Sequence, residues 1–138
     1  MICIIRIRGN VGLKSDVIEN FNRLRLKRKY ACVVIKKSPE NLGMINKVKN
    51  FVAFGEIDDE TFEKLIEARG KALNKTKKVD SKKAVAEIND GASYEKVNLK
   101  PFFRLHPPRG GIETKQHYPK GVLGNHKEHI NKLVERML

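Results

Sequence analysis

The chain has 138 residues, with 29 lysines and arginines against 16 acidic residues, so its formal net charge is +13. This charge repels itself without an anionic partner, and the phosphate backbone of a nucleic acid is the commonest one. No stretch approaches the ~18 apolar residues of a membrane-spanning helix, and the apolar start at residues 2–7 is too short for a signal peptide. Composition therefore predicts a cytosolic protein that binds nucleic acid, with no membrane partner. The plainer alternative is a soluble protein whose basic surface faces only water.

The positive charge is divided unevenly along the chain. Residues 1–57 carry a balance of +8, residues 58–98 are neutral, and residues 99–138 carry +5. We therefore expect a basic RNA-binding core, a neutral helical connection and a basic extension with these three sets of bounds. A chain of this length buries about two-thirds of its unfolded surface around one core, so we expect the extension to pack on the core as one domain.

The basic core predicts a β-α-β-α-β unit. Its first strand is apolar and β-branched before it starts to alternate, which is typical of a strand largely covered on one face. Ser15 is expected to cap the first helix, and Ser38 followed by Pro39 is a common helix start. The expected strands cover residues 2–8, 30–35 and 51–54, and the expected helices cover residues 15–29 and 39–49.

Three helices and a long loop are expected in the rest of the chain. Asp58 caps a helix that ends near Gly70, and Asn125 with Glu128 forms a capping box before the last helix. The segment at residues 106–124 is rich in glycine, proline and cations, which predicts an extended loop. The other expected elements are a polar, mobile connection at residues 71–83, a helix at 81–89, a turn at 90–91 and a short strand at 99–105.

Both cysteines, Cys3 and Cys32, lie within apolar runs that predict strands. Cysteines in such positions are usually buried and reduced, and they pack like small apolar side chains. We therefore expect two buried thiols. A disulfide or a metal-binding pair is the alternative.

A glycine loop lies between the first strand and the first helix, where a nucleotide hydrolase has its phosphate-binding loop. That motif needs four residues between its glycines and a lysine directly after the second. Here two residues separate Gly9 from Gly12, and Leu13 precedes Lys14. The spacing disfavours nucleotide hydrolysis. A simpler role for the loop is a turn that presents Arg8 and Lys14 to phosphate.

No other motif predicts catalysis or a metal site. His126 and His129 are three residues apart, with His106 and His117 as further candidates, but no cysteine or carboxylate pattern completes a zinc site. These histidines are expected to be solvated or to contact phosphate. The paired acids at residues 58–59 are explained as helix caps. We therefore expect no enzyme activity, no catalytic residue, no metal and no cofactor.

The composition favours recognition of folded RNA. The sequence has no aromatic RNP motif, no GXXG clamp with a flanking basic helix of the KH type, and no paired zinc-ligand spacing. Aromatic residues make up 7% of the chain and tryptophan is absent, so base stacking is not expected to dominate. Lysines and arginines on a rigid scaffold, together with a flexible basic loop, predict contacts to phosphates and to RNA shape.

The chain contains two groups of recognisable motifs. The first group is IRIRG at residues 5–9, LRL at 24–26, GMINKV at 43–48 and FG at 54–55. The second group is FRLHPPRGG at residues 103–111, GN at 124–125 and INKLVERM at 130–137. The first group resembles the universal ribosomal large-subunit protein family L-thirty, called L-seven in eukaryotes. The second is similar to an extension that archaeal and eukaryotic members have and short bacterial members lack.

This resemblance implies an α+β fold with a β-α-β-α-β core, in which a small three-stranded antiparallel sheet packs on helices in a ferredoxin-like arrangement, and a helical, loop-rich C-terminal extension. It implies a structural constituent of the large ribosomal subunit with no catalytic activity. The expected partners are ribosomal RNA near the central protuberance, with its small RNA as a further candidate, and neighbouring ribosomal proteins. The chain starts at the first strand, without the long basic arm of eukaryotic members, so we expect an archaeal-type long form.

Charge and resemblance together single out a set of basic side chains for contact with RNA. They are Arg6, Arg8, Lys14, Arg23, Arg25, Lys29, Lys47, Lys49, Arg104, His106, Arg109, Lys115 and Lys120. One alternative function is a free-standing RNA-binding or RNA-chaperone module, which would use the same cations. The other is an enzyme that acts on RNA or nucleotides, which only the loop at residues 9–15 and the pair His126 and His129 support.

Overall fold

The computed structural model describes residues 1–9, 12–72, 80–91, 93–108, 121 and 123–138. The strands are β1 (Ile2–Arg6), β2 (Ala31–Ile35), β3 (Val52–Glu56), β4 (Phe103–Arg104) and β5 (Gly124–Asn125). The helices are α1 (Ser15–Arg23), α2 (Pro39–Val48), α3 (Asp59–Arg69), α4 (Ser81–Asn89) and α5 (Ile130–Met137), and the 3-10 turn η1 (Lys127–His129) precedes α5. Within the described ranges, no helix has both the length and the apolar character needed to cross a membrane.

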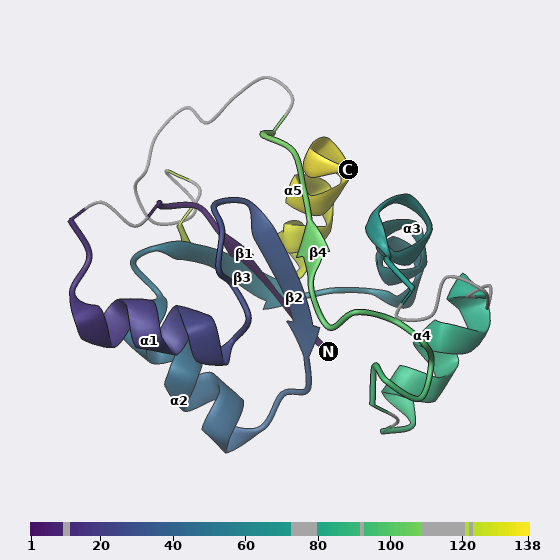
Figure 1. The fold of residues 1–138 in the computed structure, drawn as a ribbon. Coiled ribbons are helices and arrows are strands. Elements are labelled where there is room, and N and C mark those ends of the chain that lie inside the picture. Colours follow the sequence, from purple (N-terminus) through teal and green to yellow (C-terminus); the bar gives the residue numbers. More distant parts are fainter. Residues whose placement is uncertain (10–11, 73–79, 92, 109–120, 122) are drawn as a thin grey trace.

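The five strands form one sheet in the order β4-β2-β1-β3-β5 (Figure 1). β1 lies in the middle and pairs antiparallel with both neighbours, so that Cys3 lies opposite Val34 of β2 and Gly55 of β3. This pairing confirms the predicted three-stranded antiparallel sheet of a β-α-β-α-β core. The two-residue strands β4 and β5 extend its edges, with β4 antiparallel to β2 and β5 parallel to β3.

Helices cover both faces of this sheet (Figure 1). The side chains of β1 contribute alternately to two apolar clusters. Ile2 and Ile4 pack with residues of α1 and α2, whereas Cys3 and Ile5 pack with residues of α3, α4 and α5. The strand was expected to be largely covered on one face. This expectation is wrong, because both faces are buried. Apolar residues at successive positions are typical of a strand that is buried on both faces.

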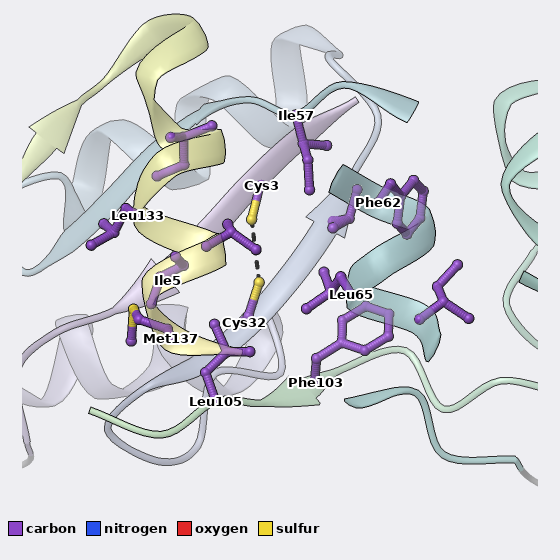
Figure 2. Packing of buried hydrophobic residues seen from close by; sticks show 14 of the residues in the cluster. Cys3, Ile5, Cys32, Ile57, Phe62, Leu65, Phe103, Leu105, Leu133 and Met137 are labelled. Atoms are coloured by element: carbon purple, nitrogen blue, oxygen red, sulfur yellow. Dashed lines mark hydrogen bonds between the residues drawn. The ribbon is translucent and has the colours of Figure 1, made fainter. Parts of the chain in front are cut away.

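The cluster on the α5 side joins parts of the chain that are far apart in sequence (Figure 2). Phe62 and Leu65 of α3, Phe103 of β4, and Leu133 and Met137 of α5 are each at most 6% exposed within it. They pack around the two cysteines of β1 and β2. Residues beyond 58 therefore share an apolar core with the central strands.

Helices α2 and α3 begin at their predicted caps. The Ser38 hydroxyl accepts a hydrogen bond from the backbone N–H of Asn41 at 3.2 Å. The Asp58 carboxylate accepts one from the backbone N–H of Thr61 at 2.7 Å. Helix α4, Ser81–Asn89, has the predicted bounds. These starts depend on local hydrogen bonds, which a sequence pattern can indicate.

Two other predicted caps are wrong. Ser15 is the first residue of α1, and Lys14 occupies the cap position without a side-chain hydrogen bond. Asn125 belongs to β5, where pairing with β3 holds its backbone in the sheet. Its side-chain oxygen accepts a hydrogen bond from the backbone N–H of Lys127 at 2.9 Å, and the 3-10 turn follows. The expected capping box of α5 therefore does not form.

Cys3 and Cys32 confirm the prediction of buried, reduced thiols, because both side chains are free and fully buried. Their sulfur atoms lie 3.2 Å apart and share a hydrogen bond (Figure 2). Disulfide sulfurs would be about 2.05 Å apart. Burial raises the pKa of the Cys32 thiol, and its hydrogen bond with Cys3 and the charge of Cys3 raise that pKa further.

We expect neither thiol of the folded protein to react with a water-soluble thiol reagent at mildly alkaline pH. The thiolate is the reactive form, and burial suppresses both its formation and its accessibility. Counting reactive thiols before and after unfolding in urea tests this expectation, and the count should rise from none to both. A thiol that reacts in the folded protein as fast as free cysteine would contradict it.

Candidate nucleic-acid interface

The register of the sheet brings several segments of the chain to one of its ends. β1 ends at Arg6, opposite Val52 at the start of β3. β2 starts at Ala31, opposite Arg104 in β4. Because β1 and β2 are antiparallel, the end of β1 adjoins the start of β2. The segments that lead into or out of these strands therefore meet at the same end of the sheet (Figure 1).

A set of exposed cations lies at this end of the sheet, which we name the basic end. They are Arg8, Arg25, Lys27, Arg28, Lys29, Lys49 and Arg104. Among the described residues, no carboxylate forms an ion pair with any of them. At the opposite end, Lys37 lies 2.9 Å from Glu56 and lowers the pKa of that carboxyl group. The basic end therefore carries uncompensated positive charge, which attracts phosphate.

Arg6 is part of the scaffold beneath this surface. Its side chain is 2% exposed, and burial lowers its pKa. The guanidinium donates hydrogen bonds of 2.8 Å to the backbone oxygens of Arg8 and Leu26, and it lies 4.2 Å from the ring centre of Phe21. The structure thus buries a residue that was predicted to contact RNA, and its guanidinium already has two backbone partners. The side chain ties the end of β1 to the segment that follows α1.

Helix α1 ends earlier than predicted, and this moves a run of cations into a loop. The backbone N–H of Leu26 donates to the Phe21 oxygen at 2.8 Å, and that of Arg25 donates to the Asn22 oxygen at 3.1 Å. These two bonds form a Schellman motif, with Arg25 in the left-handed conformation at φ 63°. Glycine usually occupies that position. The expected continuation of the helix to residue 29 is therefore wrong.

The conformation of Arg25 makes glycine the better residue for stability there. The left-handed region costs a residue with a Cβ about 1–2 kcal/mol, part of which the flexibility of unfolded glycine offsets. We expect the free energy of unfolding of Arg25→Gly to be about 0.5–1 kcal/mol higher than that of Arg25→Ala. Both variants remove the same charge. Urea unfolding of both variants tests this. Equal stabilities would contradict the left-handed conformation.

Three cations of the basic end rest on aromatic rings. The pairs are Arg8 with Phe51 at 5.5 Å, Lys29 with Tyr30 at 5.1 Å, and Arg104 with Phe102 at 5.5 Å, each measured to the ring centre. Such contacts contribute about 0.5–1 kcal/mol at exposed sites. They restrict long side chains before binding, which reduces the entropy lost when an anion is bound.

The basic end collects several of the predicted RNA contacts. They are Arg8, Arg25, Lys29, Lys49 and Arg104. Lys27 and Arg28 lie there too, and they are absent from the predicted set. The sequence feature that could have identified them is the run of five cations within seven residues at positions 23–29.

Other predicted contacts lie elsewhere on the surface. Lys14 is exposed at the start of α1, and Lys47 is exposed in the last turn of α2. Arg23 is exposed and pairs with Glu19 at 2.7 Å. A surface pair of this kind contributes about 0–1 kcal/mol, so a phosphate can replace the carboxylate at little cost. The predicted contacts that lie outside the described residues are Arg109, Lys115 and Lys120.

His106 joins the segment after β4 to the end of α5. Its backbone N–H donates to the Met137 oxygen at 3.1 Å. One ring nitrogen, Nδ1, lies 2.6 Å from the oxygen of Pro107, and the other, Nε2, forms a hydrogen bond with the backbone oxygen of Leu138. Because both ring nitrogens contact backbone oxygens, this geometry does not support the prediction that His106 contacts RNA.

The remaining histidines do not gather into a metal site in the described part of the chain. No group of three or more histidine, cysteine or acidic side chains there could hold a metal ion. The histidines were expected to be solvated or to contact phosphate, and for His126 the first of these is wrong, because the residue is 6% exposed. Its backbone N–H donates to the Phe54 oxygen at 2.7 Å. His129 is exposed at the start of α5. His117 lies outside the described residues.

Comparison with known proteins shows the family of this chain. The sequence profile described as Ribosomal protein L30p/L7e matches residues 2–52, a segment that holds six of the seven cations of the basic end. The large ribosomal subunit protein uL30 of Archaeoglobus fulgidus is 40% identical, over 99% of this chain and 99% of its own length. The uL30 protein of Methanosphaera stadtmanae is 36% identical over 100% of both chains, and that of Methanococcus vannielii is 40% identical over 98% of this chain and 97% of its own length. The chain therefore belongs to the ribosomal protein L30p/L7e family.

Proposed function

We propose that the chain binds and stabilises folded ribosomal RNA of the large subunit through phosphate contacts at the basic end. The observation that carries the proposal is the gathering of seven exposed cations at one end of the sheet, where none pairs with a carboxylate of the described residues. The relatives are large-subunit ribosomal proteins by name, and proteins of this family are structural, non-enzymatic components of the ribosome.

The fold supports this role by holding the cations on a rigid base. The buried guanidinium of Arg6 fixes the backbone at both Arg8 and Leu26. The pairing of Ala31 with Arg104 fixes β4 beside the segment that carries Arg25 to Lys29. Contacts to phosphate then position the protein, and the spacing of the cations selects an RNA whose phosphates match it.

The proposal also includes the wider setting that the resemblance implies. It places the chain on the cytoplasmic ribosome, near the central protuberance, with its small RNA and neighbouring ribosomal proteins as further partners. The full-length similarity to large ribosomal subunit proteins uL30 supports the placement on the large subunit, and the position near the central protuberance rests on the resemblance alone. Additional RNA contacts in the proposal are Lys14, Arg23, Lys47, Arg109, Lys115 and Lys120.

The salt dependence of RNA binding tests the role of the basic end. The triple variant Arg8→Ala, Lys29→Ala, Lys49→Ala removes three of its cations. In the matched control, three exposed lysines of α4 and α5 are replaced, namely Lys82→Ala, Lys83→Ala and Lys132→Ala. The probe is deproteinised large-subunit ribosomal RNA from Archaeoglobus fulgidus, measured over a range of salt concentrations.

The affinity falls as salt rises, so the slope of log affinity against log salt is negative. We expect the basic-end variant to reduce the magnitude of this slope by about 3, because each phosphate contact contributes about 1. The control variant should leave the slope close to that of the wild-type protein. If both variants reduce the magnitude of the slope equally, overall charge rather than the basic end binds the RNA, and the proposal is wrong.

A further inference from the structure

A pocket of about 200 Å³ opens at the basic end. It lies between the loop that follows α1, the start of β2 and the strand β4. Its lining consists of Arg25, Lys27, Arg28, Ala31, Phe102 and Arg104. The described lining contains four cations and no carboxylate, so the pocket suits a ligand that carries negative charge.

The volume of the pocket and the apolar part of its lining limit the kinds of ligand that it can bind. Pockets that enclose a whole small molecule have volumes of about 300–1,000 Å³, so this one accommodates only a part of a ligand. Ala31 and the half-buried ring of Phe102 add apolar surface to the cations. Phosphate alone gains nothing from an aromatic ring, whereas a nucleotide has both a phosphate and a flat base that can stack on one.

Two flat side chains in the pocket, Phe102 and Arg104, offer a surface on which a base can stack. The guanidinium of Arg104 lies 5.5 Å from the ring centre of Phe102. Both guanidinium planes and aromatic rings stack on the bases of single-stranded RNA. Arg25, which also lines the pocket, has the left-handed conformation, a position where glycine is the usual residue. Strained conformations of this kind cluster at functional sites.

We infer that this pocket binds a single unpaired nucleotide of the ribosomal RNA. The phosphate contacts the cations of the loop after α1, Arg25, Lys27 and Arg28. The base stacks on the pair formed by Phe102 and Arg104. Unpaired bases in loops and bulges are the parts of RNA that proteins read most directly, so the pocket would add specificity to the phosphate contacts. This inference rests on the function proposed above.

The variant Phe102→Leu tests the stacking contact without changing charge. Phe102 belongs to neither buried apolar cluster, so the variant is expected to fold, which urea unfolding checks. The matched control is Phe54→Leu, a half-buried ring of β3 in the other half of the sheet. The probe is again deproteinised large-subunit ribosomal RNA from Archaeoglobus fulgidus.

We expect Phe102→Leu to weaken binding by about tenfold, because a base stacked on an aromatic ring contributes about that much affinity. The slope of affinity against salt should stay unchanged, and Phe54→Leu should bind like the wild-type protein. If the wild-type protein does not bind this RNA, the proposed function fails. If the wild-type protein binds and Phe102→Leu binds equally well, only the pocket inference fails.

Ultraviolet cross-linking of the wild-type complex gives a second, independent test. A base stacked on Phe102 should cross-link to the peptide that contains this residue, and mass spectrometry should find one nucleotide attached to it. Titration with inorganic phosphate and with nucleoside monophosphates separates the nucleotide from a bare anion. Equal binding of both, unaffected by Phe102→Leu and with no cross-link at this peptide, would overturn the inference.

Discussion

Arg6→Met is expected to lower the free energy of unfolding by about 3 kcal/mol. The buried guanidinium donates to two backbone oxygens, those of Arg8 and Leu26, and hydrogen bonds from a charged group contribute about 1.5–3 kcal/mol each. Methionine keeps the apolar stem but supplies no donor. Replacing a buried charge by an apolar side chain recovers some desolvation energy, so we place the loss below the sum of two such bonds.

The matched control is Arg8→Met, which makes the same change two residues later at an exposed position. This variant loses the contact between Arg8 and the Phe51 ring, which contributes about 0.5–1 kcal/mol, so it should lose much less stability than Arg6→Met. Urea unfolding of both proteins measures the difference. If Arg6→Met were as stable as Arg8→Met, Arg6 would have no structural role and would return to the set of candidate RNA contacts.

Gly55→Ala is expected to destabilise the protein by about 3 kcal/mol, the upper part of the range for overpacked sites. A Cβ at this position would lie 2.2 Å from the backbone oxygen of Lys127 and 2.9 Å from Cβ of Ile130. One of these neighbours is backbone, which cannot rotate away. The substitution therefore forces η1 and the start of α5 away from β3, and it disturbs the cluster that contains Ile130.

Gly43→Ala is the matched control, because it makes the same change inside the exposed part of α2. Among the described residues, no atom outside the adjoining backbone of α2 and the two neighbouring residues lies within 4 Å of a Cβ there. Alanine is about 0.5–1 kcal/mol better than glycine in a helix, so this variant should be more stable than the wild-type protein. Thermal or urea unfolding should shift the two variants in opposite directions. A Gly55→Ala variant at least as stable as the wild-type protein would contradict the close contact between β3 and η1.

Local signals explain which parts of the fold the sequence predicts. The starts of α2 and α3 depend on the side chains of Ser38 and Asp58, each of which accepts a hydrogen bond from the backbone N–H three residues later in the chain. Both predictions are confirmed. The end of α1 is different. An arginine, not a glycine, takes the left-handed position at residue 25, so the composition gives no sign that the helix stops there.

The candidate site is predicted only in part, because its geometry depends on contacts between distant segments. Arg6 and Arg8 alternate with an apolar residue in the same way. Within the described part of the chain, however, only the Arg6 side chain donates to a distant segment, at Leu26, and only Arg6 is buried. The pairing of β2 with β4 places Arg104 beside Ala31, and no local pattern indicates that register. The charge pattern therefore predicts a basic surface, whereas the tertiary contacts decide which cations form it.

The most direct test of the central claim is sedimentation of a cell lysate through a sucrose gradient in high salt, with this protein quantified against ribosomal RNA. We expect one copy for each large subunit, retained after the salt wash, because a subunit component is held by many simultaneous contacts. A protein that sediments free of the large subunit, or that moderate salt removes from it, would contradict the account and favour a transient RNA-binding module.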